Sequence, residues 1–331
     1  MKFGVVPLAA AEGAILGHSV ALPGARLRKG AVLTAADIAT LQAAGIAEVT
    51  VARLATDDIA EDIAATRLAQ ALVPGDQGLT LTEAFTGRVN LKAAYPGIVQ
   101  MDVAAIHRLN RIHPAITLAT LPPMARVAPG TLVGTVKIIA YAVPDAALVA
   151  ACVVAHAAIR IRPVVRMTAC LLLTEVPGQD VKLTAKGKRA VEARLRALGI
   201  TLTDTLVTAH ATSAMAHALA TLQGDILLIL TGSATSDLHD TAPEAVRLAG
   251  GTVARFGMPV DPGNLLFLGA LHHRPVIGLP GCARSPALNG ADWVLERIAC
   301  GLEVTDDDVA QMGVGGLLKE ISIRPQLRDP Q

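Results

Sequence analysis

Aromatic residues are nearly missing from this chain, since phenylalanine, tyrosine and tryptophan make up 2% of its 331 residues. Its cores must therefore be built from alanine, valine, leucine and isoleucine. An excess of charge of one sign is missing too, because 29 lysines and arginines are balanced by 28 aspartates and glutamates, a formal net charge of +1. This balance, with no basic block interleaved with aromatics, argues against a nucleic-acid-binding protein.

Cysteines are few, and no uninterrupted apolar run is long enough to span a membrane, although 52% of the residues are hydrophobic. The four cysteines are far apart and form no C-x-x-C motif, which is typical of buried, reduced thiols. The most apolar segment, Ile138 to Ile161, contains Pro144, Asp145, His156 and Arg160. A membrane-spanning run of about 20 apolar residues would not carry these four. We therefore expect a soluble, cytoplasmic protein with no membrane partner.

The chain is long enough for two domains, and its pattern changes near residue 166. Residues 1–166 mix amphipathic helical segments with short runs of β-forming residues, which indicates an α+β domain. Thr34 and Asp102 stand where each can cap a helix. From residue 167 to residue 331, strands and helices alternate regularly. This alternation predicts an α/β domain with a doubly wound, mostly parallel sheet.

Residues 225–251 are the centre of this second domain. The unbroken apolar run Ile226 to Leu230 predicts a strand that is buried on both faces, as in a parallel sheet. A polar loop follows from Thr231 to Asp240. Thr241 and Glu244 then have the spacing of a capping box at the start of a helix. A strand, a loop and a helix start in this order bring unpaired N–H groups together, which favours an anion.

Two carboxylates, Asp237 and Asp240, lie in this same loop. They would repel a phosphate unless a cation bridges them to it. The combination predicts a polyanionic ligand held with Mg²⁺. A purely structural alternative remains for each residue, since Asp240 could serve only as a helix cap and Asp237 could be a solvated loop carboxylate.

Ligands of wound parallel sheets bind beyond the carboxyl ends of the strands. In this sequence those ends lead into four loops, and Ser285 with Pro286 should begin the last helix after the fourth. The loops are Thr174 to Asp180, Ala209 to Ser213, Thr231 to Asp240, and Gly281 to Ser285.

Three segments of the second half resemble the molybdopterin-binding family, in its MoeA-like and MogA-like branches. The segment T-G-S-A-T-S-D-L-H-D-T-A-P-E-A, from Thr231 to Ala245, is similar without gaps to that family's T-G-G-T-G-x-x-x-x-D-x-T-P-E-A loop. Met258 to Gly263 resembles its x-x-P-G-K-P segment, and Gly278 to Gly281 resembles the start of its G-L-P-G-N-P segment. The resemblance covers roughly residues 167–301.

This resemblance implies a protein that binds molybdopterin, or the finished molybdenum cofactor, in cofactor biosynthesis or in delivery to a molybdoenzyme. It also implies a homo-oligomer. Asp240 and Asp237 would hold Mg²⁺ and serve any catalysis. The remaining residues that we expect to contact the ligand are Thr231, Gly232, Ser233, Thr235, Ser236, Glu244, Glu175, Pro262, Gly263, Pro280 and Gly281.

Departures from the family pattern argue against catalysis. Ser233 and Thr235 replace two glycines of the adenylylating branch, so the main chain cannot approach a phosphate so closely. Asn264 replaces the lysine of the molybdate-inserting branch and cannot supply its charge. Binding without turnover is therefore our first hypothesis. The alternatives are an active Mg²⁺-dependent transferase, moving a nucleotide or molybdate, and a scaffold whose site has decayed.

Two other features have both a functional and a structural interpretation. Cys282 could touch the ligand or could be a plain buried thiol. In the first half, Gly87, Arg88 and Asn90 form a polar turn. Arg88 could reach a phosphate from there, or the turn could be purely structural.

Overall fold

The computed structural model describes residues 1–318, and the chain forms two compact units. Unit 1 contains residues 1–95 and 99–161, and unit 2 contains residues 96–98 and the chain from Arg162 onward. Within the described residues, no helix is both long enough and apolar enough to cross a bilayer.

Unit 1 begins with a small antiparallel sheet in the order β1-β5-β2, beside a hairpin of β3 and β4. The predicted Thr34 cap is confirmed, because its side chain accepts the N–H of Asp37 in a complete capping box. Leu16, Leu41 and Val51 belong to a core of this segment. Its elements are β1 (Lys2–Pro7), η1 (Leu8–Ala10), β2 (Ile15–Leu16), β3 (Val20–Leu22), β4 (Ala25–Leu27), α1 (Ala35–Ala43) and β5 (Glu48–Arg53).

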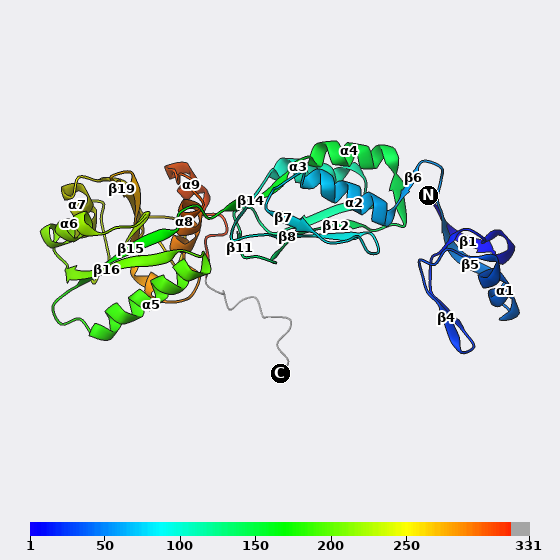
Figure 1. The fold of residues 1–331 in the computed structure, drawn as a ribbon, viewed down its shortest axis with the longest axis horizontal. Helices are drawn as coiled ribbons and strands as arrows, with labels where there is room; N and C mark the ends of the chain where they lie inside the picture. The colour runs from blue at the N-terminus through cyan, green and yellow to red at the C-terminus, as the bar shows by residue number, and fades with distance from the viewer. Residues whose placement is uncertain (319–331) are drawn as a thin grey trace. The chain divides into compact units, whose positions relative to one another are not determined.

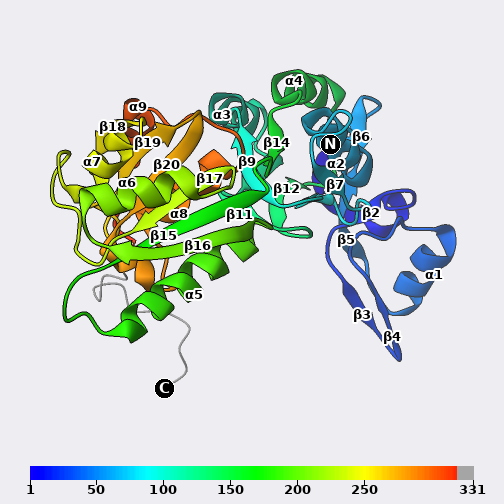
Figure 2. The same cartoon turned by 60° about the vertical axis from the view of Figure 1, so that its left-hand side comes forward.

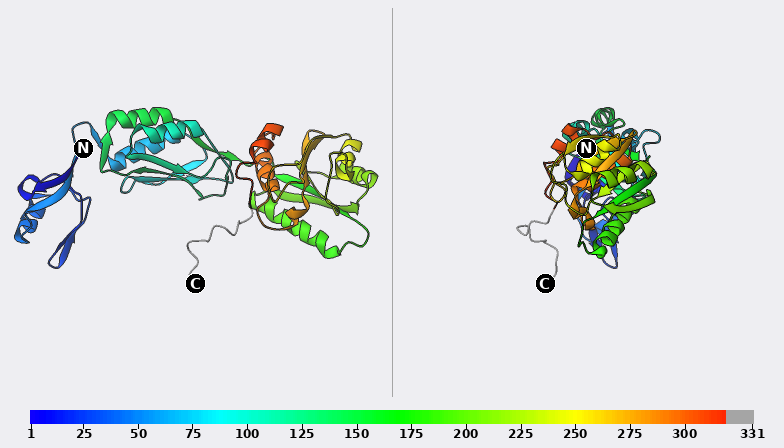
Figure 3. Two further views of the ribbon diagram at one scale, coloured as in Figure 1. Left: turned by 180° about the vertical axis from the view of Figure 1, so that it is seen from behind. Right: turned by 90° about the vertical axis from the view of Figure 1, so that its left-hand side faces the viewer.

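The rest of unit 1 has a second core, between an antiparallel sheet in the order β10-β12-β8-β7 and the helices α2, α3 and α4. In Figure 3 (left), the green helix α4 lies along one side of this sheet. The predicted Asp102 cap is also confirmed, because its carboxylate accepts the N–H of Ala105. The elements are β6 (Asp58–Ala60), α2 (Glu61–Leu72), β7 (Leu79–Leu81), β8 (Arg88–Ala93), β9 (Gly97–Met101), α3 (Val103–Ile112), β10 (Ile116–Thr120), β11 (Arg126–Val127), β12 (Leu132–Ile138), β13 (Ala142–Pro144), α4 (Asp145–Ala155) and β14 (Ile159–Pro163).

Unit 2 contains a six-stranded sheet in the order β16-β15-β17-β20-β19-β18. The first four strands in this order are parallel, and β19 and β18 are antiparallel to their neighbours. The prediction of a mostly parallel sheet in the C-terminal half is therefore confirmed. The elements are β15 (Thr168–Glu175), α5 (Val181–Ala197), β16 (Thr201–Ala209), α6 (Thr212–Thr221), β17 (Ile226–Leu230), α7 (Thr241–Leu248), β18 (Thr252–Phe256), β19 (Phe267–Leu271), β20 (Arg274–Leu279), η2 (Gly281–Arg284), α8 (Gly290–Ala299) and α9 (Asp306–Gln311).

Helices pack against both faces of this sheet. Leu171 and Leu228 face a core that includes residues of α5 and α8, whereas Leu172 and Leu227 face a core with α6 and α7. Figures 1 and 2 show α5 and α6 on opposite sides of β15 and β16. All five residues of β17 are buried, as the unbroken apolar run predicted.

Two predicted helix starts are wrong. Asp240, not Thr241, is the N-cap of α7, and its carboxylate accepts the N–H of Thr241. The last helix after β20 starts later than Ser285, because Asn289 caps α8 and forms a capping box with Asp292. The observed cap is an acidic or amide side chain near the expected one: Asp240 precedes Thr241 by one residue, and Asn289 follows Ser285 by four.

Candidate ligand-binding site

The carboxyl ends of β15, β16 and β17 are joined by the hydroxyl of Thr174. Its Oγ1 accepts the main-chain N–H of Gly232 at 2.8 Å and lies 3.0 Å from Nδ1 of His210. Thr174 is buried, with 2% of its surface exposed, so this hydroxyl is a fixed part of the site. The loops after three neighbouring strands therefore meet at one place, at the edge that the sequence pointed to.

Gly232 lies against the loop that follows β15. A Cβ at this position would come within 2.5 Å of Oε1 of Gln179 and within 2.8 Å of the carbonyl oxygen of Thr174. Thr231, next to it, is buried. A side chain at position 232 would push the two loops apart, so glycine is required here for close main-chain packing.

The loop from Ser233 to Asp240 is fastened by the Asp240 carboxylate. Its two oxygens accept the N–H groups of Ser236 at 2.8 Å and Thr241 at 2.6 Å. Burial alone would raise the pKa of Asp240, but these two hydrogen bonds, together with the nearby His210, outweigh it and lower the pKa. Of the other loop residues, Thr235 is buried while Ser233 and Ser236 are exposed. Asp240 therefore stays ionised and orders the loop.

Asp237 and Asp240, the predicted Mg²⁺ ligands, both accept main-chain N–H groups in this structure. Asp237 uses Oδ1 to accept the N–H of His239 at 2.8 Å, and both oxygens of Asp240 already accept main-chain N–H groups. Across residues 1–318, no three histidine, cysteine, aspartate or glutamate side chains are grouped as a metal site would need. Mg²⁺ is commonly held by one or two carboxylates together with water and substrate phosphate, so a role of these two residues toward Mg²⁺ stays a prediction.

Two other predicted contact residues, Glu244 and Glu175, are engaged by their own neighbours. Glu244 pairs with Nδ1 of His239 at 2.9 Å and with Arg247 at 2.7 Å, and the hydrogen bond from His239 is the largest of the effects that lower its pKa. Glu175 accepts the hydroxyl of Thr184, at the first turns of α5, at 2.8 Å. Each carboxylate thus fixes a loop locally.

The four remaining predicted residues gather around the start of α8. The carbonyl of Pro262 accepts the N–H of Gly290 at 2.8 Å, and Gly263 has a φ of +145°. Pro280 and Gly281 lead into η2, where Cys282 is exposed. Asn289 joins these segments, because its Nδ2 donates to Sγ of Cys282 over 3.0 Å.

Arg284 connects this second group to the first. It donates to the carbonyl of Thr231 and, over 3.4 Å, to the carbonyl of Gly281. Its buried Nε has no hydrogen-bond partner, and burial lowers the pKa of its guanidinium. Within the described part of the chain no carboxylate pairs with it. A partly buried cation without a counterion favours an anionic ligand.

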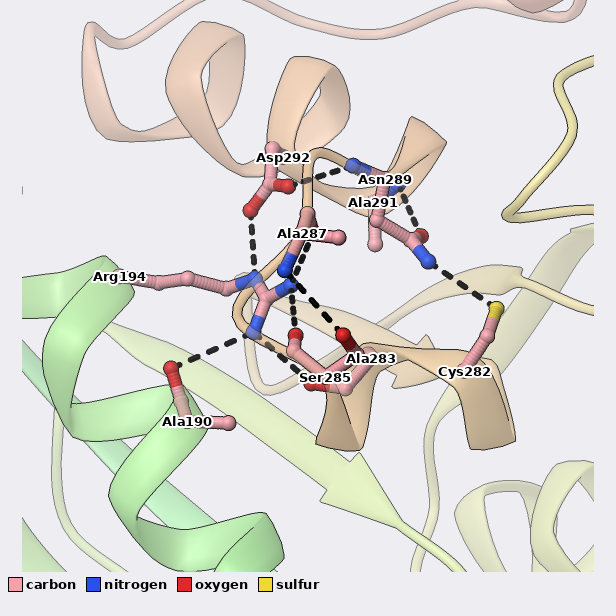
Figure 4. A network of polar contacts seen from close by, with 9 residues as sticks. All are labelled: Ala190, Arg194, Cys282, Ala283, Ser285, Ala287, Asn289, Ala291 and Asp292. Carbon is pink, nitrogen blue, oxygen red and sulfur yellow. Dashed lines mark hydrogen bonds and ion pairs between the residues drawn. The ribbon is translucent and has the colours of Figure 1, made fainter. Parts of the chain in front are cut away.

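The loop that carries Arg284 is held in place by Arg194 of α5 (Figure 4). Its guanidinium donates to the carbonyls of Ala283 and Ser285, both at 2.8 Å, and to that of Ala287 at 3.1 Å. The same group pairs with the carboxylate of Asp292 at 2.6 Å. This network fixes the main chain on both sides of Arg284.

Sequence reasoning missed three of these residues: Thr174, His210 and Arg284. All three lie in, or at the start of, the loops that the strand pattern placed at the carboxyl ends. The burial of Arg284 could not be read from the sequence, because it involves packing beside Gly187 of α5, where an added Cβ would lie 3.6 Å from Cγ of Arg284.

Comparisons with known proteins give distant similarity only. A family model described as a domain of unknown function, DUF8806, matches residues 5–53. No curated protein matches the chain. A molybdopterin biosynthesis MoeA protein from Pyrococcus horikosii is 14% identical, with 91% of this chain and 76% of that chain covered and a TM-score of 0.32. A molybdenum cofactor biosynthesis protein from Pyrococcus furiosus is 11% identical, with 90% and 61% covered and a TM-score of 0.24. TM-scores this low assign this chain to no family.

Proposed function

We propose that unit 2 binds a phosphorylated pterin of the molybdopterin type at the carboxyl ends of β15, β17 and β20. The protein would serve biosynthesis of the molybdenum cofactor or its delivery to a client enzyme. The observation that carries the proposal is Arg284, a partly buried guanidinium with an unpartnered Nε and no carboxylate partner among the described residues. A phosphate beside this guanidinium would supply the missing negative charge.

The pterin part of the proposal rests on the three sequence segments between Thr231 and Gly281 that resemble the molybdopterin-binding family. Two of these segments meet at Arg284, which donates to the carbonyls of Thr231 and Gly281. Arg284 would also replace the charge that is lost at Asn264, so the binding role does not depend on a lysine there.

The hydrogen bonds of the two loop carboxylates support a protein that binds its ligand without transferring a group. Phosphoryl and nucleotidyl transfer depend on metal ions that neutralise developing charge. Asp237 and Asp240 both accept main-chain N–H groups, and Asp240 also caps α7. The residues of this loop are therefore suited to ordering the main chain around a ligand.

The test is retention of molybdopterin by the full chain under anaerobic conditions, measured as pterin fluorescence released after gel filtration. Arg284→Met should weaken binding by about ten- to a hundredfold, as expected for loss of a charged hydrogen bond. Arg274→Met is the matched control, because Arg274 begins β20 and donates to the carbonyl of Leu222 over 2.8 Å, at the opposite end of the strand.

Equal retention by wild type and Arg284→Met would contradict the proposal.

Adding MgATP, MgCTP or molybdate to the loaded protein tests the rival function. A stoichiometric complex with no turnover supports binding, whereas turnover would establish a transferase.

A further inference from the structure

Unit 1 contains a cavity that the proposed function does not use. Its volume is about 470 Å³, and its lining includes Phe3, Lys29, Glu61, Lys137 and Tyr141. Pockets for small molecules typically enclose about 300–1,000 Å³ and combine apolar walls with a few polar groups. The size and lining of this cavity both meet that description.

Aromatic rings are concentrated here in a chain that has only four phenylalanines, two tyrosines and one tryptophan. The rings of Phe3 and Tyr141 are nearly parallel, at 18°, with centroids 6.5 Å apart. The Tyr141 hydroxyl donates to the carbonyl of Gly17 over 3.1 Å, which fixes its ring. Phe3 is 54% exposed, so its ring is not needed to fill a core. The pair provides a stacking surface for a planar ring.

Three charged groups line the same cavity. Burial raises the pKa of Glu61, while Lys137 and Lys29 act in the opposite direction. The Glu61 carboxylate accepts no hydrogen bond from any side chain or main-chain group in residues 1–318. An acceptor that is partly buried and lacks a donor, beside two ammonium groups, is suited to a ligand that brings both a donor and an anion.

The turn at Thr86 and Gly87 shapes this wall. Thr86 has a left-handed φ of +48°, and Gly87 has a φ of +71°. A Cβ on Gly87 would lie 2.4 Å from the carbonyl oxygen of Ile138 and 2.8 Å from Oε2 of Glu61. The polar turn noted in the sequence therefore requires glycine because the main chain passes directly over the Glu61 carboxylate. Strained main chain of this kind is found preferentially at binding sites.

We propose that this cavity binds a small molecule made of an amino-substituted heteroaromatic ring and a phosphate. The ring stacks on Phe3 and Tyr141, its amino group donates to Glu61, and the phosphate lies between Lys29 and Lys137. A nucleoside monophosphate and a phosphorylated pterin share this chemistry. The inference is independent of the site in unit 2.

Isothermal titration calorimetry of the full chain tests the proposal. The experiment uses the Arg284→Met background, in which binding at the unit 2 site should be weakened about ten- to a hundredfold. AMP and a pterin phosphate are the two candidate ligands, and adenosine and ribose 5-phosphate separate the ring from the phosphate. AMP or the pterin phosphate, or both, should give saturable binding. Adenosine and ribose 5-phosphate should each bind at least about tenfold more weakly than the ligand that carries both the ring and the phosphate.

Variants then locate the site. Phe3→Ala should weaken binding about tenfold through loss of stacking, whereas Phe85→Ala, which removes a 76% exposed ring outside the cavity lining, should leave it unchanged. Glu61→Gln and Lys137→Met should each weaken it, with Lys92→Met as an exposed control on the neighbouring strand β8. No saturable heat with either ligand, or undiminished binding in both Phe3→Ala and Glu61→Gln, would overturn the proposal.

Discussion

Nε of Arg194 lies 2.6 Å from Oδ1 of Asp292, which joins α5 to the first turn of α8. The two side chains are only 9% and 12% exposed. Asp292 also accepts the N–H of Asn289 at 2.8 Å, so the pair fixes the cap of α8 together with the loop before it. The loop that carries Arg284 is therefore held in place by a buried ion pair that lies outside the ligand site.

Replacing Arg194 by methionine should lower the free energy of unfolding of unit 2 by about 3–5 kcal/mol, because the Asp292 carboxylate is left buried without its cation. Fluorescence of Trp293, the single tryptophan of the chain and a residue of α8, reports this transition in urea. Arg189→Met, at an exposed position on α5, is the control and should change the value by less than about 0.5 kcal/mol.

The double variant Arg194→Met, Asp292→Leu gives a sharper version of this test. With both charges removed, part of the lost stability should return, because no unpaired ion remains in the interior; the rest stays lost, because the buried N–H of Asn289 no longer has its acceptor. A single variant that is as stable as wild type would show that the ion pair contributes nothing to unit 2.

Local signals in the sequence predicted local structure well. The caps at Thr34 and Asp102 and the buried strand Ile226 to Leu230 follow from neighbouring residues alone, and the structure contains all three. The strand β19 was not predicted, because its hairpin with β20 turns at His272 and His273, whose φ angles are +49° and +64°. Hairpin turns of this kind are usually recognised by Asn-Gly or Asp-Gly, and neither occurs here.

The site was predictable only as a set of loops. The parallel strand pattern located the loop from Thr231 to Asp240, but hydrogen-bonding partners at a distance in sequence decide which atoms are still available to a ligand. The carboxylate of Asp240 accepts the N–H groups of Ser236 and Thr241, whereas Arg284 packs beside Gly187 of α5 and has no carboxylate partner within residues 1–318. Such competition depends on three-dimensional contacts and cannot be read from spacing.

Gly232→Ala and Gly281→Ala form a matched pair of substitutions at the site. At Gly232 the new methyl group would meet main-chain atoms of Thr174 and Val176 at 2.8 and 3.1 Å, which cannot move independently of β15. At Gly281 the nearest atom is Nη1 of Arg284, at 3.4 Å, the far end of a flexible side chain. We expect Gly232→Ala to cost about 1–3 kcal/mol of stability and Gly281→Ala clearly less. Urea unfolding followed by Trp293 measures both, and equal costs would contradict the close approach at Gly232.

The Thr174 hydroxyl gives a prediction about hydrogen bonding. Thr174→Val keeps the shape of the side chain but removes the acceptor for the N–H of Gly232, at a cost of about 1–3 kcal/mol for an unsatisfied buried donor. Thr174→Ser retains the hydroxyl and should lose less. If valine were as stable as serine at this position, the loops after β15 and β17 would not depend on this hydroxyl.

Acid titration tests the role of Asp240. The pKa of its carboxylate is lowered in the folded chain, because the hydrogen bonds from Ser236 and Thr241 and the nearby His210 outweigh the opposing effect of burial. A group whose pKa is lower when folded stabilises the protein above its unfolded pKa of about 3.9, and this contribution is lost as the pH falls through the folded pKa.

Asp240→Asn keeps an oxygen that can cap α7 but has no charge. The wild type should therefore be more stable than Asp240→Asn above about pH 5, and the difference should shrink below about pH 4. Asp240→Ala, which also loses the cap, should remain less stable than Asp240→Asn across the whole range, by about 1 kcal/mol. A difference between wild type and Asp240→Asn that persisted unchanged to pH 2 would show that the ionised carboxylate does not order this loop.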